Sequence, residues 1–160
     1  MFGLFKKQEK YEVSAPVKGE AVSIHEVSDP TFGEEILGKG IAIRPAEGEF
    51  YAPADGMVTL LFDTLHAVRI TSKDGAEILI HVGLDTVALK GEYFTAHVKT
   101  GDSVKKGDLL LSADLEKIRA AGYDTITPMI ICNTSDYAEV SAERSGSVNP
   151  GDVVITLVKK

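Results

Sequence analysis

The sequence predicts an all-β domain, an antiparallel β-sandwich or flattened barrel with an internal quasi-repeat and one or two short helices. From Gly40 onward, four or five short apolar segments are separated by turns that contain Pro or Gly, which is typical of consecutive strands. One frame then occurs twice, at 104–111 and 148–155: valine, two turn residues, glycine, aspartate and three aliphatic residues. Each copy predicts a turn that leads into a buried strand.

Composition indicates one globular domain. The chain has 160 residues, of which 44% are hydrophobic and 26% are charged, enough apolar surface for a sizeable core. Its net charge of -7 and pI near 5.1 argue against nucleic acid as a partner and favour a basic protein or a cationic surface. Cys132 is the single cysteine, so no internal disulfide is possible. Because no secretory leader or membrane-spanning apolar segment is visible, we expect a cytoplasmic protein.

At the amino-terminal end we expect a flexible tail over 1–12, followed by a single domain over 13–160. The opening residues MFGLFKK place apolar side chains beside two lysines, which predicts either a frayed terminus or a weak contact with a membrane surface. Alternation over 13–27 predicts a strand, a turn and a second strand. A loop follows at Asp29, and the next apolar residues form either core or the lip of a site: Phe32, Ile36 and Leu37.

Near the carboxyl-terminal end, the segment 114–121 is the one convincing helix pattern, with Asp114 as its N-cap and Gly122 as its stop. Pro128 then begins an apolar strand. Cys132 falls inside that strand, which predicts a buried and unreactive thiol.

The segment 77–82 places a histidine where a strand ends. Alternate residues of this segment are apolar, which predicts a strand that buries one set of side chains and lets His81 emerge at its tip. Gly83 ends the strand and lets other backbone approach the imidazole. His66 begins the preceding predicted strand, and Asp74-Gly75 form the hairpin turn between the two. We therefore expect the two imidazoles to lie side by side.

Motifs for the common cofactors and hydrolytic centres are absent. The chain contains no G-x-G-x-x-G, G-x-x-x-x-G-K-[ST], G-x-S-x-G or H-E-x-x-H. The histidine pair remains, and the residues alone leave three interpretations open. The pair can bind an incidental metal ion, with Asp85 as a third ligand, or simply cap the strand ends. In the third interpretation, one neutral imidazole carries a phosphoryl group and the other stabilises it.

A resemblance favours the third interpretation. The segment IHVGLDTVALKG at 80–91, together with TLHA at 64–67, GIAIRP at 40–45, APADG at 52–56 and TP at 127–128, resembles the glucose-type enzyme IIA of the bacterial phosphoenolpyruvate-dependent sugar phosphotransferase system. The resemblance extends from about residue 13 to 158. It implies an antiparallel β-sandwich with short helices.

The resemblance also implies site roles. His81 would accept a phosphoryl group on Nε2 from the phosphohistidine of the carrier protein HPr and pass it to a cysteine of a sugar-specific enzyme IIB. His66 would steady the phosphoryl group, and Thr64 would orient the ring of His66. The phosphoryl group comes from phospho-HPr, so we expect no nucleotide and no other cofactor.

We further expect a docking surface around the histidines for HPr and for the enzyme IIB/IIC permease. Its acidic residues, Asp29 and Asp85, would face a cationic partner. Its apolar residues would be Phe32, Ile36, Leu37, Phe62, Leu79 and Val87. A regulator that binds other proteins according to its phosphorylation state stays open as a second role. The repeated frames are also similar to biotinyl and lipoyl carrier domains, but the turn that presents a modified lysine is absent.

Overall fold

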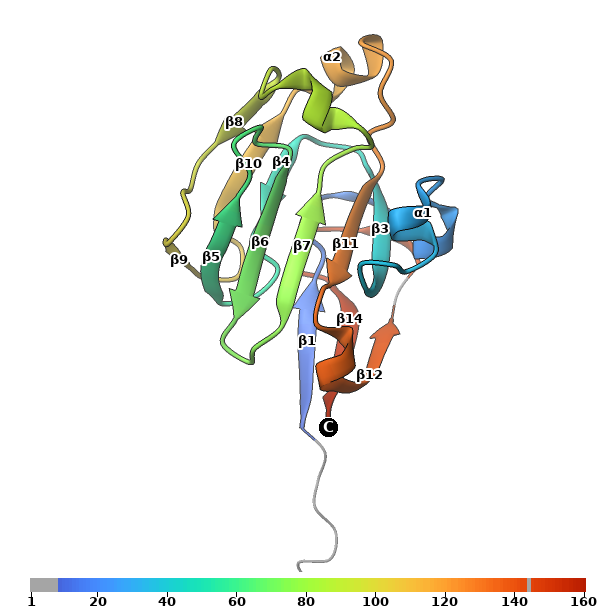
Figure 1. Cartoon of the computed structure of the whole chain (residues 1–160), viewed down its shortest axis with the longest axis vertical. Helices are drawn as coiled ribbons and strands as arrows, with labels where there is room; N and C mark the ends of the chain where they lie inside the picture. Colours follow the sequence, from blue (N-terminus) through green and yellow to red (C-terminus); the bar gives the residue numbers. More distant parts are fainter. Residues whose placement is uncertain (1–8, 144) are drawn as a thin grey trace, which may run out of the picture.

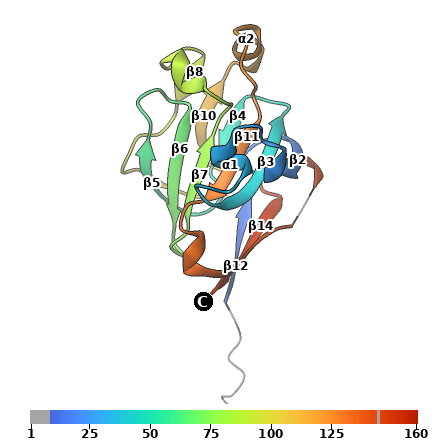
Figure 2. The same cartoon turned by 45° about the vertical axis from the view of Figure 1, so that its right-hand side comes forward.

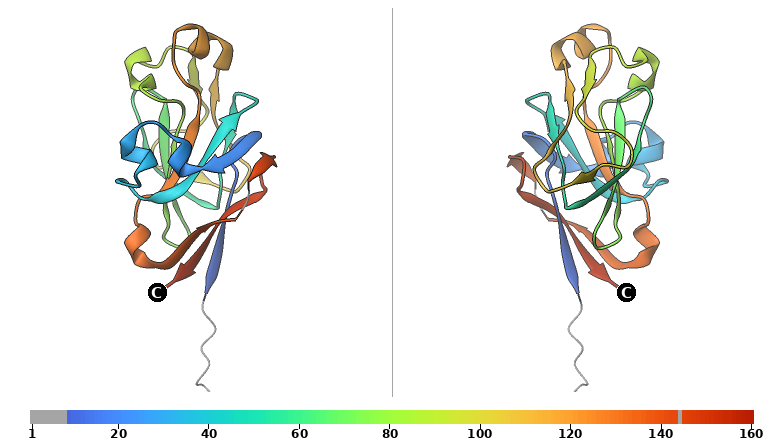
Figure 3. Two further views of the ribbon diagram at one scale, coloured as in Figure 1. Left: turned by 90° about the vertical axis from the view of Figure 1, so that its right-hand side faces the viewer. Right: turned by 90° about the vertical axis from the view of Figure 1, so that its left-hand side faces the viewer.

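A computed structural model describes residues 9–143 and 145–160, and it confirms an antiparallel all-β architecture (Figure 1). The main sheet has eight strands in the order β13-β2-β3-β11-β7-β6-β5-β9. Two further three-stranded sheets have the orders β1-β14-β12 and β4-β10-β8. The C-terminus and α2 lie at opposite ends of the molecule (Figure 3).

The strands of the described residues are β1 (Lys10–Ser14), β2 (Gly19–Ser23), β3 (Lys39–Pro45), β4 (Glu49–Tyr51), β5 (Gly56–Leu61), β6 (Ala67–Ser72), β7 (Glu77–His81), β8 (Phe94–Ala96), β9 (Ser103–Val104), β10 (Leu109–Ala113), β11 (Thr127–Ile131), β12 (Tyr137–Ala142), β13 (Gly146–Val148) and β14 (Val153–Lys159). The α-helices are α1 (Pro30–Gly33) and α2 (Leu115–Ala120), and the short 3-10 helices are η2 (Ile24–Glu26), η3 (Thr86–Leu89) and η4 (Thr134–Asp136).

The main sheet is buried on both faces of its central strands. On the inner face, Ile78, Ile80 and Val82 pack into the large core that joins the sheets, as the alternation of β7 predicts. On the outer face, Leu79 is 8% exposed and belongs to a second apolar cluster. Phe32 of α1 belongs to the same cluster, and α1 lies over this face of the sheet (Figure 2).

The repeated frame forms three equivalent turns, one more than the sequence predicts. In each turn the aspartate carboxylate accepts the N–H of the residue three positions earlier, and the glycine has a positive φ, between 93° and 98°. The glycine N–H and the aspartate carbonyl both bond to one residue of a facing segment. The turns span 98–102, 104–108 and 148–152, and they dock on Val58, Ala52 and Ala15. The copy at 98–102 lacks the three aliphatic residues that the sequence pattern requires, so the pattern misses it.

Two predicted boundaries need correction. Strand β1 begins at Lys10 and pairs with β14, so residues 10–12 belong to the folded sheet and not to a tail. The predicted terminal patch at 1–7 lies outside the described residues. Cys132 follows β11 and is only partly buried, because the strand ends at Ile131 and the chain turns into η4.

The predicted helix is confirmed as α2. The Asp114 side chain accepts the N–H of Lys117 at 3.1 Å as the N-cap, and Gly122 follows with a φ of 96°. Among the helices of the described residues, none could span a lipid bilayer.

We expect Gly107→Ala to destabilise the fold by about 1–2 kcal/mol, because a φ of 93° places an L-residue in the left-handed region. Apart from the glycine itself and its two chain neighbours, no atom lies within 4 Å of the added Cβ, so the loss reports backbone conformation and not a steric clash. Urea unfolding measures the loss. Lys106→Ala, at the exposed neighbouring position of the same turn, is the control and should change stability little. Equal effects of the two substitutions would contradict this role of the glycine.

Candidate functional site

The two histidines meet at the end of the β6–β7 hairpin. In the antiparallel ladder Ala67 lies opposite His81, and the Val82 N–H donates to the His66 carbonyl at 2.7 Å, which continues the pairing by one step. The ring centroids of His66 and His81 are 4.8 Å apart, and the ring planes are nearly perpendicular at 85°. The predicted side-by-side placement is therefore confirmed.

A hydrogen bond fixes the tautomer of His81. Its Nδ1 lies 2.7 Å from the Gly83 carbonyl oxygen, which only accepts hydrogen bonds, so Nδ1 carries the proton. The neutral ring then has its lone pair on Nε2. Gly83 has a φ of 81°, and a Cβ at this position would lie 2.9 Å from the carbonyl oxygen of Asp124. As the sequence predicts, a glycine is needed here so that other backbone can approach.

His66 is held in a more enclosed position. The residue is 3% exposed, and its Nδ1 lies 2.7 Å from the Thr64 hydroxyl, as the resemblance implies. Phe62 packs edge-on against the ring at 5.5 Å between centroids. Leu65, between Thr64 and His66, adopts a φ of 60°, unusual for an aliphatic residue, and this tight turn places both polar side chains on one side.

Burial keeps both imidazoles neutral. Desolvation, with a smaller contribution from the charge of His81, lowers the pKa of His66 to about 4. Desolvation also lowers the pKa of His81, although the Gly83 carbonyl and the charges of Asp29 and Asp85 oppose this shift. At pH 7 the site therefore offers a nucleophilic nitrogen lone pair beside a second neutral ring.

The predicted docking residues divide into two groups. Phe32 and Leu79 are 4% and 8% exposed and lie beneath the surface, so they offer a partner little area; Phe32 contacts the His81 ring at 4.9 Å between centroids. The exposed fractions of Ile36, Leu37 and Val87 are 69%, 43% and 53%. These three are the exposed apolar residues of the predicted set.

The remaining predicted residues differ in surroundings. Phe62 and Asp29 are half-buried, and the Asp29 carboxylate accepts the Thr31 N–H at 3.0 Å as the N-cap of α1. Asp85 is exposed, with a φ of 60°. Within the described residues, Asp85 does not join the histidines in a group of three potential metal ligands, so it is not the third ligand that the sequence suggests.

Sequence reasoning missed the groups that hold the turn after β7. The Thr86 hydroxyl donates to the Val82 carbonyl at 2.6 Å, and the Leu84 N–H donates to the Asp124 carbonyl at 3.0 Å. Backbone carbonyls have no sequence signature. Of these groups, only the Thr86 side chain, five residues after His81, can be recognised in the sequence.

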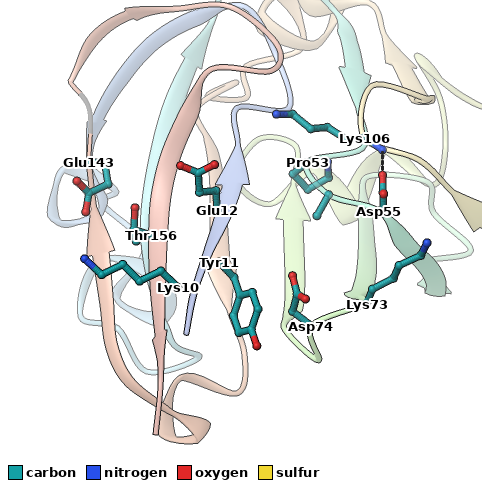
Figure 4. A pocket seen from close by; sticks show the side chains of 11 residues that line it. Lys10, Tyr11, Glu12, Pro53, Asp55, Lys73, Asp74, Lys106, Glu143 and Thr156 are labelled. Carbon is teal, nitrogen blue, oxygen red and sulfur yellow. Dashed lines mark hydrogen bonds between the residues drawn. The ribbon is translucent and has the colours of Figure 1, made fainter. Parts of the chain in front are cut away.

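A separate groove of about 740 Å³ lies between β1 and the turn that joins β6 to β7, at the opposite end of β7 from His81 (Figure 4). Side chains of both charges line it, among them Lys10, Glu12, Lys73 and Asp74. Because these opposite charges select no single kind of ligand, the groove does not compete with the histidine pair as the candidate site.

The fold and the site define a class: antiparallel β-sandwich domains that present two neutral imidazoles at the end of paired central strands. Residues 11–137 match the family model described as phosphoenolpyruvate-dependent sugar phosphotransferase system, EIIA 1. The chain belongs to this family, which confirms the resemblance noted in the sequence.

Similar proteins extend the match over almost the whole chain. The chain is 46% identical over 149 residues to a PTS system glucose-specific EIIA component of Oceanobacillus iheyensis, covering 92% of this chain and 90% of that protein. It is 51% identical over 145 residues to a PTS system beta-glucoside-specific EIIBCA component of Bacillus subtilis, covering 91% of this chain but only 24% of that protein. The chain thus spans about a quarter of the length of such relatives. The solved structure of glucose permease IIA from Mycoplasma capricolum superposes with a TM-score of 0.87 at 35% identity, covering 96% of this chain and 99% of that chain.

We expect stability to fall as the pH drops from 6.5 towards 4. Over this range an unfolded histidine, with its ordinary pKa of 6.5, binds a proton that folded His66, with a pKa of about 4, does not bind. One such proton corresponds to a slope of about 1.4 kcal/mol per pH unit, and the lowered pKa of His81 adds to it.

Urea unfolding between pH 7 and pH 4.5 measures this slope. His66→Gln should make it shallower, whereas His97→Gln, at an exposed histidine outside the pair, should leave it unchanged. A slope that is the same in wild type and His66→Gln would contradict a neutral, buried His66.

Proposed function

We propose that this protein is a phosphoryl carrier that holds the group on Nε2 of His81. The donor is the phosphohistidine of HPr, and the acceptor is a cysteine of a sugar-specific enzyme IIB. The observation that carries the proposal is the hydrogen bond from His81 Nδ1 to the Gly83 carbonyl, because it leaves the Nε2 lone pair free beside a second neutral imidazole. Membership of the sugar phosphotransferase family supports it.

Each transfer exchanges one bond to phosphorus for another. The Nε2 lone pair attacks the phosphorus atom as the donor N–P bond breaks, and the electron pair of that bond returns to the donor imidazole. In the second step a thiolate of the acceptor attacks, the new S–P bond forms, and His81 recovers its Nε2 lone pair. Nδ1 keeps its proton throughout, with the Gly83 carbonyl as its partner.

His66 is placed to stabilise the phosphoryl oxygens. If the Thr64 hydroxyl donates to Nδ1, the proton of the neutral His66 ring lies on Nε2 and can donate to an oxygen of the transferring group. Because its pKa is about 4, His66 acts as a neutral donor at physiological pH. A neutral donor stabilises the transition state without holding the product as tightly as a cation would.

The surroundings suit protein partners. Exposed Ile36, Leu37 and Val87 offer apolar side chains to a partner. Phe32, Phe62 and Leu79 belong to the second apolar cluster, in which Phe32 contacts the His81 ring and Phe62 contacts the His66 ring. Asp29 and Asp85 and the net charge of -7 favour a cationic partner such as HPr. Beta-glucoside relatives named EIIBCA support a partnership with enzyme IIB and IIC.

The same surface suits a regulatory role. A phosphoryl group on His81 adds a charge of about -1.5 to -2 beside this apolar area. Desolvating that charge costs free energy, so a protein that docks on the free form should bind the phosphorylated form more weakly. Transporters or enzymes bound in this way would respond to the phosphorylation state.

We expect His81→Ala to take up no phosphoryl group, because the substitution removes the ring whose Nδ1–H bonds to the Gly83 carbonyl and whose Nε2 lone pair lies beside a second neutral imidazole. The variant, wild type and His97→Ala are each incubated with phosphoenolpyruvate, enzyme I and HPr. Intact mass is then measured at high pH, where phosphohistidine is stable. Wild type and His97→Ala should gain one phosphoryl group. Labelling of His81→Ala at the wild-type rate would remove His81 as the acceptor.

His66→Gln should still accept a phosphoryl group but should pass it to enzyme IIB about 10²-fold more slowly, the usual effect of losing one well-placed donor. The amide keeps an N–H, so acceptance survives, but it lacks the ring geometry set by Thr64. Rapid quench of the phosphorylated variant mixed with enzyme IIB measures the transfer step alone. Wild-type transfer would refute the stabilising role of His66.

A further inference from the structure

A buried threonine braces the turn that follows β7. Thr86 is 0% exposed, and its hydroxyl donates to the Val82 carbonyl at 2.6 Å. This bond spans Gly83, the residue whose carbonyl accepts the hydrogen bond from His81. Two backbone bonds anchor the same turn: Val82 N–H to the His66 carbonyl at 2.7 Å, and Leu84 N–H to the Asp124 carbonyl at 3.0 Å. The turn between His81 and Thr86 therefore has a fixed course.

The methyl group of Thr86 also limits the position of Gly83. A Cβ built on Gly83 would lie 2.6 Å from Thr86 Cγ2 and 2.9 Å from the Asp124 carbonyl oxygen, so the glycine backbone is packed closely against both. A peptide group with such neighbours has little room to rotate. Its carbonyl oxygen is the one that lies 2.7 Å from His81 Nδ1.

The hydroxyl does not serve as an ordinary helix cap. Helix η3 begins at Thr86, its N-cap residue is Asp85, and Asp85 makes no side-chain capping bond. The Thr86 hydroxyl instead points back towards the strand end, to the carbonyl of the residue that follows the histidine. Asp85 adopts a φ of 60°, a conformation that needs support from its neighbours.

We propose that Thr86 is a positioning residue that fixes the tautomer of His81: its hydroxyl and methyl group hold the 82–86 turn so that the Gly83 carbonyl accepts a hydrogen bond from Nδ1–H. A neutral imidazole without a partner exchanges between two tautomers, and only the Nδ1–H form has a lone pair on Nε2. The consequence for phosphoryl transfer rests on the function proposed above, whereas the effect on the tautomer does not.

The test compares Thr86→Val, which removes the hydroxyl at almost constant volume, with Thr86→Ser, which restores it. Ser72→Ala is the matched control: Ser72 is 7% exposed, and its hydroxyl accepts the Ala76 N–H at 3.0 Å at the other end of the same hairpin. Long-range ¹⁵N–¹H NMR of the His81 ring gives the share of each tautomer. Phosphoryl uptake from phospho-HPr and urea unfolding are measured on the same samples.

Thr86→Val should convert His81 from the Nδ1–H form to a mixture of tautomers and slow phosphoryl uptake by about 10- to 100-fold, as expected for a misplaced reacting group. Thr86→Ser should keep the Nδ1–H form and recover most of the rate. Ser72→Ala should lose stability but keep both the tautomer and the rate.

A wild-type tautomer and rate in Thr86→Val would overturn the proposal, as would an equal loss of rate in Ser72→Ala. If Thr86→Val does not fold, Thr86→Ala is judged by the same criteria, because it removes the hydroxyl without putting a methyl group in its place. If wild type takes up no phosphoryl group, the phosphoryl-carrier function fails, and the NMR comparison still decides whether Thr86 sets the tautomer.

Discussion

The candidate site depends on the register of β6 against β7. Because side chains alternate between the faces of a strand, a shift of one residue would turn His81 into the core and replace it with an aliphatic residue. The pairing of Ala67 with His81 sets this register. Strand β5 pairs with β6 and strand β11 pairs with β7, so the hairpin is held by a neighbouring strand on each side. The position of the imidazoles is therefore a property of the whole sheet.

Burial then determines the chemistry that the pair can perform. The second apolar cluster, which includes Phe32 and Leu79, reaches the sheet beneath the histidines, and its low polarity favours the uncharged rings. Within the described residues, no buried side-chain nitrogen or oxygen atom lacks a hydrogen-bond partner. Neutral rings with fixed partners need little reorganisation when charge develops at a bound phosphoryl group.

One turn design occurs three times in the rest of the fold. Three turns of the same design dock on Ala15, Ala52 and Val58, and each satisfies its backbone through one glycine and one aspartate. Within each turn, the bond to the aspartate carboxylate joins positions three apart, whereas the glycine N–H and the aspartate carbonyl bond to a segment that is distant in the sequence. The turns connect the strands while leaving the end of β7 free for the site.

The sequence predicts the succession of short strands, the α2 caps, two of the three repeated turns and the adjacency of His66 and His81. These features follow from alternation, turn residues and spacing within about 20 residues. The start of β1 at Lys10 was missed, since its partner β14 is at the other end of the chain. Two features of the site are visible only in the folded chain. Phe32 and Leu79 lie beneath the surface. The carbonyls of Gly83 and Asp124 and the hydroxyl of Thr86 hold the His81 ring and the turn after it. Burial and backbone hydrogen bonds depend on which distant segments meet, and a carbonyl group looks the same in every residue of a sequence.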